Sequence, residues 1–174
     1  LLHDFGKLVL IYNYPEKAVS LYEDKVFEEY LSETNQLVLE QLVFGRNHTE
    51  AGGYAASEMN FPRQLIDVIR YHHDPDDPKV RKDSEETARA VSAANLATKA
   101  MGSSFVGVHP TETESDWEAC AADPIWDHFV DETGEEEDRT MALMEELKAR
   151  RRDIVLFTKF FLDPDIPDSA QESR

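Results

Sequence analysis

Five residues of this sequence have the side chains and the spacing of a metal site. His3 and Asp4 are adjacent near the start, His48 follows in the middle, and His72 and His73 form a second adjacent pair. Neutral imidazole and carboxylate groups suit divalent Fe, Mn, Zn or Ni. A metal held by such groups polarises a phosphoryl oxygen and generates a hydroxide nucleophile, so the pattern indicates phosphoester chemistry.

The elements that must position these residues are predicted to be helices, and we find no alternating strand pattern. Residues 1–12 are expected to be the end of a helix, with His3 and Asp4 on it. Pro15 is expected to open a second helix that runs to about Leu31, because proline suits the first helical turn.

The central histidine is predicted to start a helix. Asn47 followed by Glu50 is typical of a capping box, which puts His48 in the first helical turn. Before it, a short packed helix is expected over residues 35–44, ending at Gly45. Its expected apolar contacts are Leu37, Leu39, Leu42 and Val43.

The second histidine pair is expected in the last turn of a helix that begins at Pro62 and stops at Asp74-Pro75. Leu65, Ile66 and Ile69 would face inward, and His72 and His73 would extend that buried face. Ser84 is expected to cap a further helix, from Glu85 to Met101. Its inward line would hold Ala88, Val91, Asn95, Thr98 and Met101.

The sequence predicts four parts in all. Residues 1–101 would form the helical domain, and residues 102–134, which are acidic and contain few apolar side chains, an irregular loop or excursion. Residues 135–162 would form a C-terminal helix that packs on the domain, and residues 163–174 a flexible tail.

Composition narrows the classes of partner. A net charge of −18 over 174 residues disfavours nucleic acid and anionic membrane surfaces as partners. No apolar run approaches a membrane span. The single cysteine, Cys120, allows no intrachain disulfide, which fits a reducing cytoplasm. The chain begins with Leu1 in mid-pattern, so we expect its natural beginning to be missing.

Three motifs together resemble the HDOD family, a branch of the HD superfamily related to the HD-GYP phosphodiesterases. They are LLHDFGKLVL at residues 1–10, FGRNHTEAGGYAASEM at 44–59 and FPRQLIDVIRYHHDP at 61–75. The resemblance extends over about residues 1–101. It implies an all-α, HD-like helical bundle whose N-terminal helical half, upstream of His3, is absent from this chain.

By this resemblance, His3 and Asp4 would be the central ligand pair, with Asp4 able to bridge two metals. His48, His72 and His73 would hold a second or third metal. Lys7 matches a lysine that lies near the substrate phosphate in active relatives. Asp4 and Lys7 would therefore be the catalytic residues if the chain is an enzyme.

Two departures count against catalysis. Active relatives carry a closing Asp on the helix after the His-His pair, where this chain has Asn95. A neutral amide binds a transition metal less well than a carboxylate and does not offset its charge. The Gly-Tyr-Pro motif of the phosphodiesterase branch is also absent, since His73 is followed by Asp74-Pro75-Asp76-Asp77.

Three functions stay open. The leading hypothesis is a regulatory module of bacterial signal transduction that binds other signalling domains or proteins and keeps a partial metal pocket. The alternative is a metal-dependent phosphohydrolase or phosphodiesterase. The third is structural support for a neighbouring domain. Residue by residue, His3-Asp4 could instead be a hydrogen-bonded pair that holds helices together, His48 a surface residue in the first helical turn, and Lys7 a solvated charge.

Overall fold

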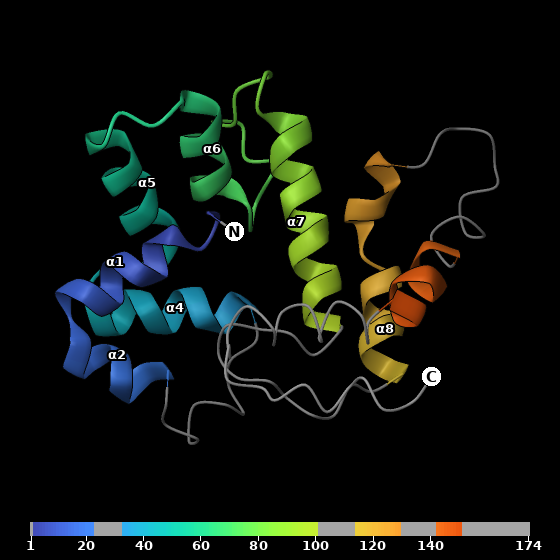
Figure 1. Cartoon of the computed structure of the whole chain (residues 1–174), viewed down its shortest axis with the longest axis horizontal. Helices are drawn as coiled ribbons and strands as arrows, with labels where there is room; N and C mark the ends of the chain where they lie inside the picture. Colours follow the sequence, from blue (N-terminus) through green and yellow to red (C-terminus); the bar gives the residue numbers. More distant parts are fainter. Residues whose placement is uncertain (1, 23–32, 101–113, 130–141, 151–174) are drawn as a thin grey trace, which may run out of the picture. The chain divides into compact units, whose positions relative to one another are not determined.

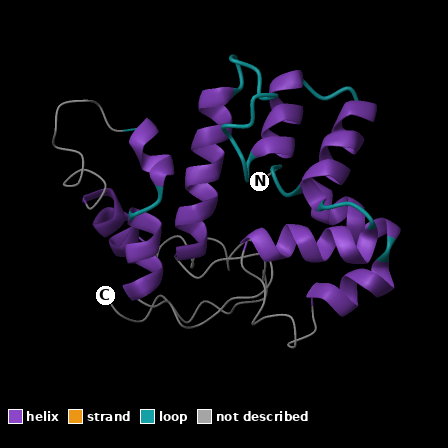
Figure 2. Ribbon diagram, turned by 180° about the vertical axis from the view of Figure 1, so that it is seen from behind, coloured by secondary structure: helices purple, strands orange, loops and turns teal. Residues whose placement is uncertain are grey.

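The computed structural model describes residues 2–22, 33–100, 114–129 and 142–150, and these residues are helices joined by turns, without strands (Figure 1). The fold is therefore all-α, and Figure 2 shows the same from behind. The described residues fall into two compact units, one up to Leu96 and one from Ala97 onward. In neither unit do they include a helix of the length and apolar character needed to cross a bilayer.

The first helix, α1, spans Phe5–Asn13, and α2 spans Pro15–Tyr22. Pro15 opens α2 as predicted, and the rest of the predicted helix, to Leu31, lies outside the described residues. His3 and Asp4 were expected on a helix, which is wrong: they form the turn that leads into α1, with Asp4 at its N-cap.

Helix α4 spans Glu33–Phe44 and is followed by Gly45, whose φ of 80° is left-handed, as the predicted helix end requires. Phe44 joins a core with Leu10 and Leu21 of α1 and α2. Leu42, however, was expected to pack and is 76% exposed. The buried face of α4 is instead polar, with Gln36 and Glu40 inside.

Helix α5, His48–Glu58, starts as predicted, because the Asn47 side chain accepts a hydrogen bond from the backbone N–H of Glu50 at 3.0 Å. It packs closely on α1 through Gly6 and Gly52. A Cβ on Gly6 would overlap the carbonyl oxygen of His48, and a Cβ on Gly52 would press on the backbone of Gly6. This glycine contact brings the start of α1 against the start of α5.

Helix α6 spans Arg63–Tyr71, with Pro62 at its N-cap and His72 at its C-cap. Ile69 is buried as expected, whereas Leu65 and Ile66 are half-buried. Helix α7 spans Glu85–Ala100. Four of its expected inward residues lie in the described range: Ala88 is buried, and Val91, Asn95 and Thr98 are half-buried.

The second unit corrects one expectation. Residues 102–134 were expected to be an irregular loop or excursion, but Glu114–Ala121 form helix α8, and Pro124–His128 form a 3-10 turn, η1. Residues 142–150 are helical, within the predicted C-terminal helix. Trp117, Cys120 and Met144 are buried in this unit. The tail predicted for residues 163–174 lies outside the described residues.

Candidate metal centre

The structure brings together all five residues that the sequence pattern singles out. His3 and Asp4 come from the turn before α1, His48 is the first residue of α5, and His72 and His73 follow α6 directly. His48 and His72 are buried, whereas His3, Asp4 and His73 are half-buried. The interpretation of His48 as a surface residue is therefore wrong.

Four side-chain atoms meet at the centre of this cluster. Asp4 Oδ1 lies 3.4 Å from His48 Nε2 and 3.8 Å from His72 Nε2. The Nε2 atoms of His48 and His72 are 3.5 Å apart, and His73 Nε2 is 3.2 Å from His48 Nε2. One nitrogen from each of three histidines therefore faces one carboxylate oxygen.

The cluster offers two overlapping sets of ligands. Ligand atoms of His48, His72 and His73 all lie within 4.8 Å of one another, and so do those of His3, Asp4 and His72. The rings of His3 and His72 meet edge to face with centroids 4.8 Å apart. His72 belongs to both sets, which makes it the shared member of the cluster.

Hydrogen bonds fix which nitrogen of each buried ring carries the proton. His48 Nδ1 donates to Glu40 Oε2 at 2.6 Å, and His72 Nδ1 donates to the carbonyl oxygen of Ile69 at 3.1 Å. A carbonyl oxygen only accepts, and so does an ionised carboxylate. In the neutral ring the other nitrogen, Nε2, is then a bare lone pair, which is the form that binds a metal.

The charge states also match a metal site. Burial would raise the pKa of Asp4, but hydrogen bonds and charge from His3 and Lys7 outweigh it and hold that pKa far below its usual range. Burial, with charge from His73 and His48, lowers the pKa of His72 to about 2. Near neutral pH, Asp4 is therefore ionised and His72 neutral, as metal ligands must be.

One atom of the cluster has no hydrogen-bond partner. Asp4 Oδ1 is buried and accepts no hydrogen bond within the described part of the chain. A buried ionised oxygen without a partner is costly. It faces the lone pairs of His48 Nε2 and His72 Nε2, so three electron-rich atoms point at one another. A divalent cation would neutralise all three, and the residues present therefore fit a metal ion.

Lys7 is also buried, with its Nζ 2.9 Å from Asp4 Oδ2. The interpretation of Lys7 as a solvated surface charge is therefore wrong. Its ammonium group and the imidazole of His3, 3.3 Å from the same oxygen, hold the outer oxygen of Asp4. The inner oxygen, Oδ1, is thereby directed at the buried histidines.

Comparison with known proteins finds a family match for the part of the chain that holds the cluster. Residues 1–75, which contain every residue of the cluster, match the HDOD domain. The HDOD match covers less than half of the 174 residues. An uncharacterized protein of Treponema pallidum (strain Nichols) is 30% identical over 99 residues, which are 57% of this chain and 18% of that relative. The chain thus spans less than a fifth of the relative's length, and no solved structure matches it.

The cluster of His3, Asp4, His48, His72 and His73 is supported by one residue that the sequence did not lead us to expect, Glu40. It is fully buried on α4 and accepts hydrogen bonds from the backbone N–H and Nδ1 of His48, at 2.7 and 2.6 Å. Burial would raise the pKa of Glu40, but these bonds keep it lowered. The available signal was the spacing of Gln36 and Glu40, which lie one helical turn apart on one face of α4. The leucines and valines between and after them drew attention to the apolar positions instead.

Asn95, at the position where active relatives of the HDOD family carry Asp, is half-buried on α7. It lies one helical turn after Val91, which lines a cavity next to His3. Its assignment as the closing position stays a prediction, because that assignment rests on the resemblance alone.

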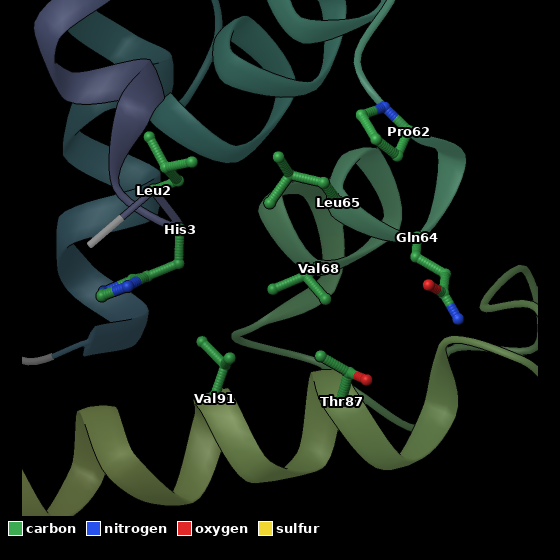
Figure 3. A pocket seen from close by; sticks show the side chains of 8 residues that line it. All are labelled: Leu2, His3, Pro62, Gln64, Leu65, Val68, Thr87 and Val91. Atoms are coloured by element: carbon green, nitrogen blue, oxygen red, sulfur yellow. The ribbon is translucent and has the colours of Figure 1, made fainter.

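A cavity of about 440 Å³ adjoins the cluster of histidines and Asp4 at His3. Figure 3 shows Leu2 and His3 on one side, Leu65 and Val68 of α6 opposite, and Val91 of α7 below them. The remaining lining residues are Pro62, Gln64 and Thr87. The cavity is largely apolar, and neither Lys nor Arg, the usual phosphate-binding side chains, is among these lining residues.

A second cavity, of about 390 Å³, reaches His73 from another side and is polar. Arg70 and Lys79 supply positive charge, but Glu50, Asp74 and Asp77 line the same space. The mixed charges make this cavity a poor fit for a phosphodiester, which carries negative charge only.

Proposed function

We propose that this HDOD chain is a regulatory module of bacterial signal transduction whose cluster holds a divalent metal ion. The observation that carries the proposal is the meeting of His48 Nε2, His72 Nε2 and Asp4 Oδ1, three atoms that all accept when the two neutral rings carry their proton on Nδ1. A cation is the simplest group that makes this arrangement favourable.

The metal would be held by His48, His72, His73 and Asp4, with His3 beside them. Imidazole and carboxylate ligands favour Fe, Mn, Zn or Ni. Such an ion would supply Lewis acidity to a bound water or phosphoryl group. The protein's own part is to hold His72 neutral and the Asp4 carboxylate ionised by the contacts described above.

A regulatory role is preferred over catalysis for two reasons. The position that the resemblance predicts to close the site carries Asn95 in place of a carboxylate. The cavity at His3 is largely apolar and has neither Lys nor Arg in its lining, whereas phosphate recognition relies on positive charge. The partners would be other signalling domains or proteins in the cytoplasm. The net charge of −18 makes nucleic acid an unfavourable partner.

The test is elemental analysis of the chain purified without chelator, together with a hydrolysis assay on bis-p-nitrophenyl phosphate in the presence of Mn²⁺. We expect a transition metal at near-stoichiometric level and no hydrolysis above that of the His72→Ala variant. A wild-type chain that stays metal-free on titration with Fe²⁺, Mn²⁺, Zn²⁺ and Ni²⁺ would contradict the proposed metal site.

The second candidate is a metal-dependent phosphohydrolase or phosphodiesterase. It is favoured by Lys7, whose ammonium group is buried beside Asp4 in the position that the family resemblance assigns to phosphate contact. Turnover of the same phosphodiester that is lost in both Asp4→Asn and Lys7→Met, with metal still bound in the second variant, would favour this candidate over the regulatory one.

A further inference from the structure

The fully buried carboxylate of Glu40 is surrounded by four hydrogen-bond donors from three elements. Oε2 accepts from the backbone N–H of His48 at 2.7 Å and from His48 Nδ1 at 2.6 Å. Oε1 accepts from Tyr22 Oη at 2.9 Å and from Gln36 Nε2 at 3.1 Å. Each oxygen of the Glu40 carboxylate thus accepts two hydrogen bonds from protein groups, and the side chain is fully buried from solvent.

These contacts fix which oxygen of the Glu40 carboxylate faces His48. Burial and the charge of Glu40 raise the pKa of Tyr22, so its hydroxyl remains a donor. Gln36 approaches through its amide nitrogen, which also only donates. Since both donors hold Oε1, Oε2 is left for His48 alone, and rotation of the carboxylate would break all four bonds.

The hydrogen bond between Glu40 and His48 Nδ1 determines the state of the opposite ring nitrogen, Nε2. A proton held on Nδ1 by Glu40 leaves Nε2 bare, and Nε2 is the atom that faces Asp4 Oδ1 and His72 Nε2 at 3.4 and 3.5 Å. A carboxylate on the outer nitrogen of a metal-bound histidine fixes its tautomer and raises its basicity.

We infer that Glu40 is a positioning residue that holds His48 in its metal-binding tautomer, with Tyr22 and Gln36 fixing the carboxylate from α2 and α4. The inference rests on the proposed metal site, but the tautomer is a property of the metal-free chain. It adds to the site a residue that lies outside the His-Asp motifs and touches no metal.

The experiment compares the wild-type 174-residue chain with Glu40→Gln and the matched control Gln36→Ala. Glu40→Gln keeps the shape and one acceptor oxygen but removes the charge. Gln36→Ala removes a hydrogen bond to Oε1 and leaves Oε2 on His48. Zn²⁺ affinity is measured by competition with a chromophoric chelator. Two-bond ¹⁵N–¹H correlation spectra of the metal-free proteins report the His48 tautomer.

We expect Glu40→Gln to weaken Zn²⁺ binding by about 10–100-fold, the range for outer-shell partners of metal-bound histidine. We expect Gln36→Ala to stay within about threefold, since the ionised oxygen on His48 remains. The wild-type spectrum should show the His48 proton on Nδ1, and Glu40→Gln should show a mixture of tautomers. Unchanged affinity and unchanged tautomer in Glu40→Gln would overturn the inference.

Two outcomes separate this inference from the proposed function. If the wild-type chain binds no Zn²⁺, the metal proposal fails, and loss of the single tautomer in Glu40→Gln still supports positioning. If Glu40→Gln does not fold, the wild-type spectrum decides by itself: a His48 proton on Nε2 in the metal-free chain overturns the inference, and a proton on Nδ1 supports it.

Discussion

The Nε2 atoms of His48 and His72 lie 3.5 Å apart, and in neutral rings whose proton is on Nδ1 both are lone pairs. Both rings donate from Nδ1, to Glu40 and to the Ile69 carbonyl. Two facing lone pairs repel, and the nearby Asp4 Oδ1 adds negative charge. These hydrogen bonds leave the centre of the cluster electron-rich. This excess of lone pairs is the physical basis of the proposed metal site.

His72 should be the ligand whose loss weakens metal binding most, because it belongs to both ligand sets. We expect His72→Gln to lower Zn²⁺ affinity by more than about 100-fold, beyond the range for outer-shell partners. Isothermal titration calorimetry is the measurement, with His128→Gln as control because His128 is exposed on η1. Equal affinities of the two variants would contradict the role of His72.

The contact between Gly6 and Gly52 should tolerate no side chain. A Cβ on Gly6 would overlap backbone atoms of His48 and Gly52. Because these are backbone atoms, the overlap is relieved only when α1 and α5 move apart. We expect Gly6→Ala to lower the free energy of unfolding by about 3 kcal/mol, measured by urea unfolding. Gly45→Ala is the control: its Cβ meets open space, so only the left-handed φ costs about 1 kcal/mol. A smaller loss in Gly6→Ala than in the control would refute the close packing.

The sequence predicted the local features of this unit well, and the reasons are physical. The Asn47 cap and the end of α4 at Gly45 depend on a few neighbouring residues whose chemistry is specific. Burial was harder to predict, because it depends on which segments meet. Leu42 is exposed and Glu40 is buried, since α4 turns its polar face toward His48.

The same distinction applies to the candidate site. The motifs indicated which five residues converge, but the hydrogen-bond acceptors behind the histidines could not be predicted. Glu40 lies eight residues before His48 on another helix, and the Ile69 carbonyl belongs to the backbone. Helix α8 was missed for a different reason: the acidic, apolar-poor composition around it suggested a loop, although Trp117 and Cys120 are buried on it.

Ser84 should stabilise the junction of α6 and α7 through its hydroxyl. Ser84 is fully buried, and its Oγ donates to Asp67 Oδ2 at 2.9 Å. Arg81 holds the same oxygen at 2.6 Å, so Asp67 keeps a partner when the hydroxyl is removed. We expect Ser84→Ala to lose about 1 kcal/mol in urea unfolding, the value of one hydrogen bond. The exposed Ser57→Ala should lose almost nothing; a similar loss in both would exclude a specific role for the Ser84 hydroxyl.

Cys120 should be protected from thiol reagents in the folded second unit. Burial raises the pKa of its thiol to about 11, and the charge of Asp123 adds to this effect. The side chain is 1% exposed, with its sulfur 3.8 Å from Met144 Sδ. Because the thiolate is the reacting form, both effects slow the reaction.

The measurement is the rate of reaction with Ellman's reagent at mildly alkaline pH, in buffer and in denaturant. Cys120 is the single cysteine of the chain, so the signal belongs to it alone. At such a pH, two to three units below the raised pKa, the thiolate fraction falls by about 100-fold relative to a free thiol, and burial slows access further. We therefore expect the native chain to react at least about 100-fold more slowly than the unfolded one.

Met144→Ala should speed the native reaction by opening the contact at sulfur, while the exposed Leu143→Ala should not. Comparable rates in native and unfolded chains would show that the packing of α8 against the helix of residues 142–150 does not protect the thiol.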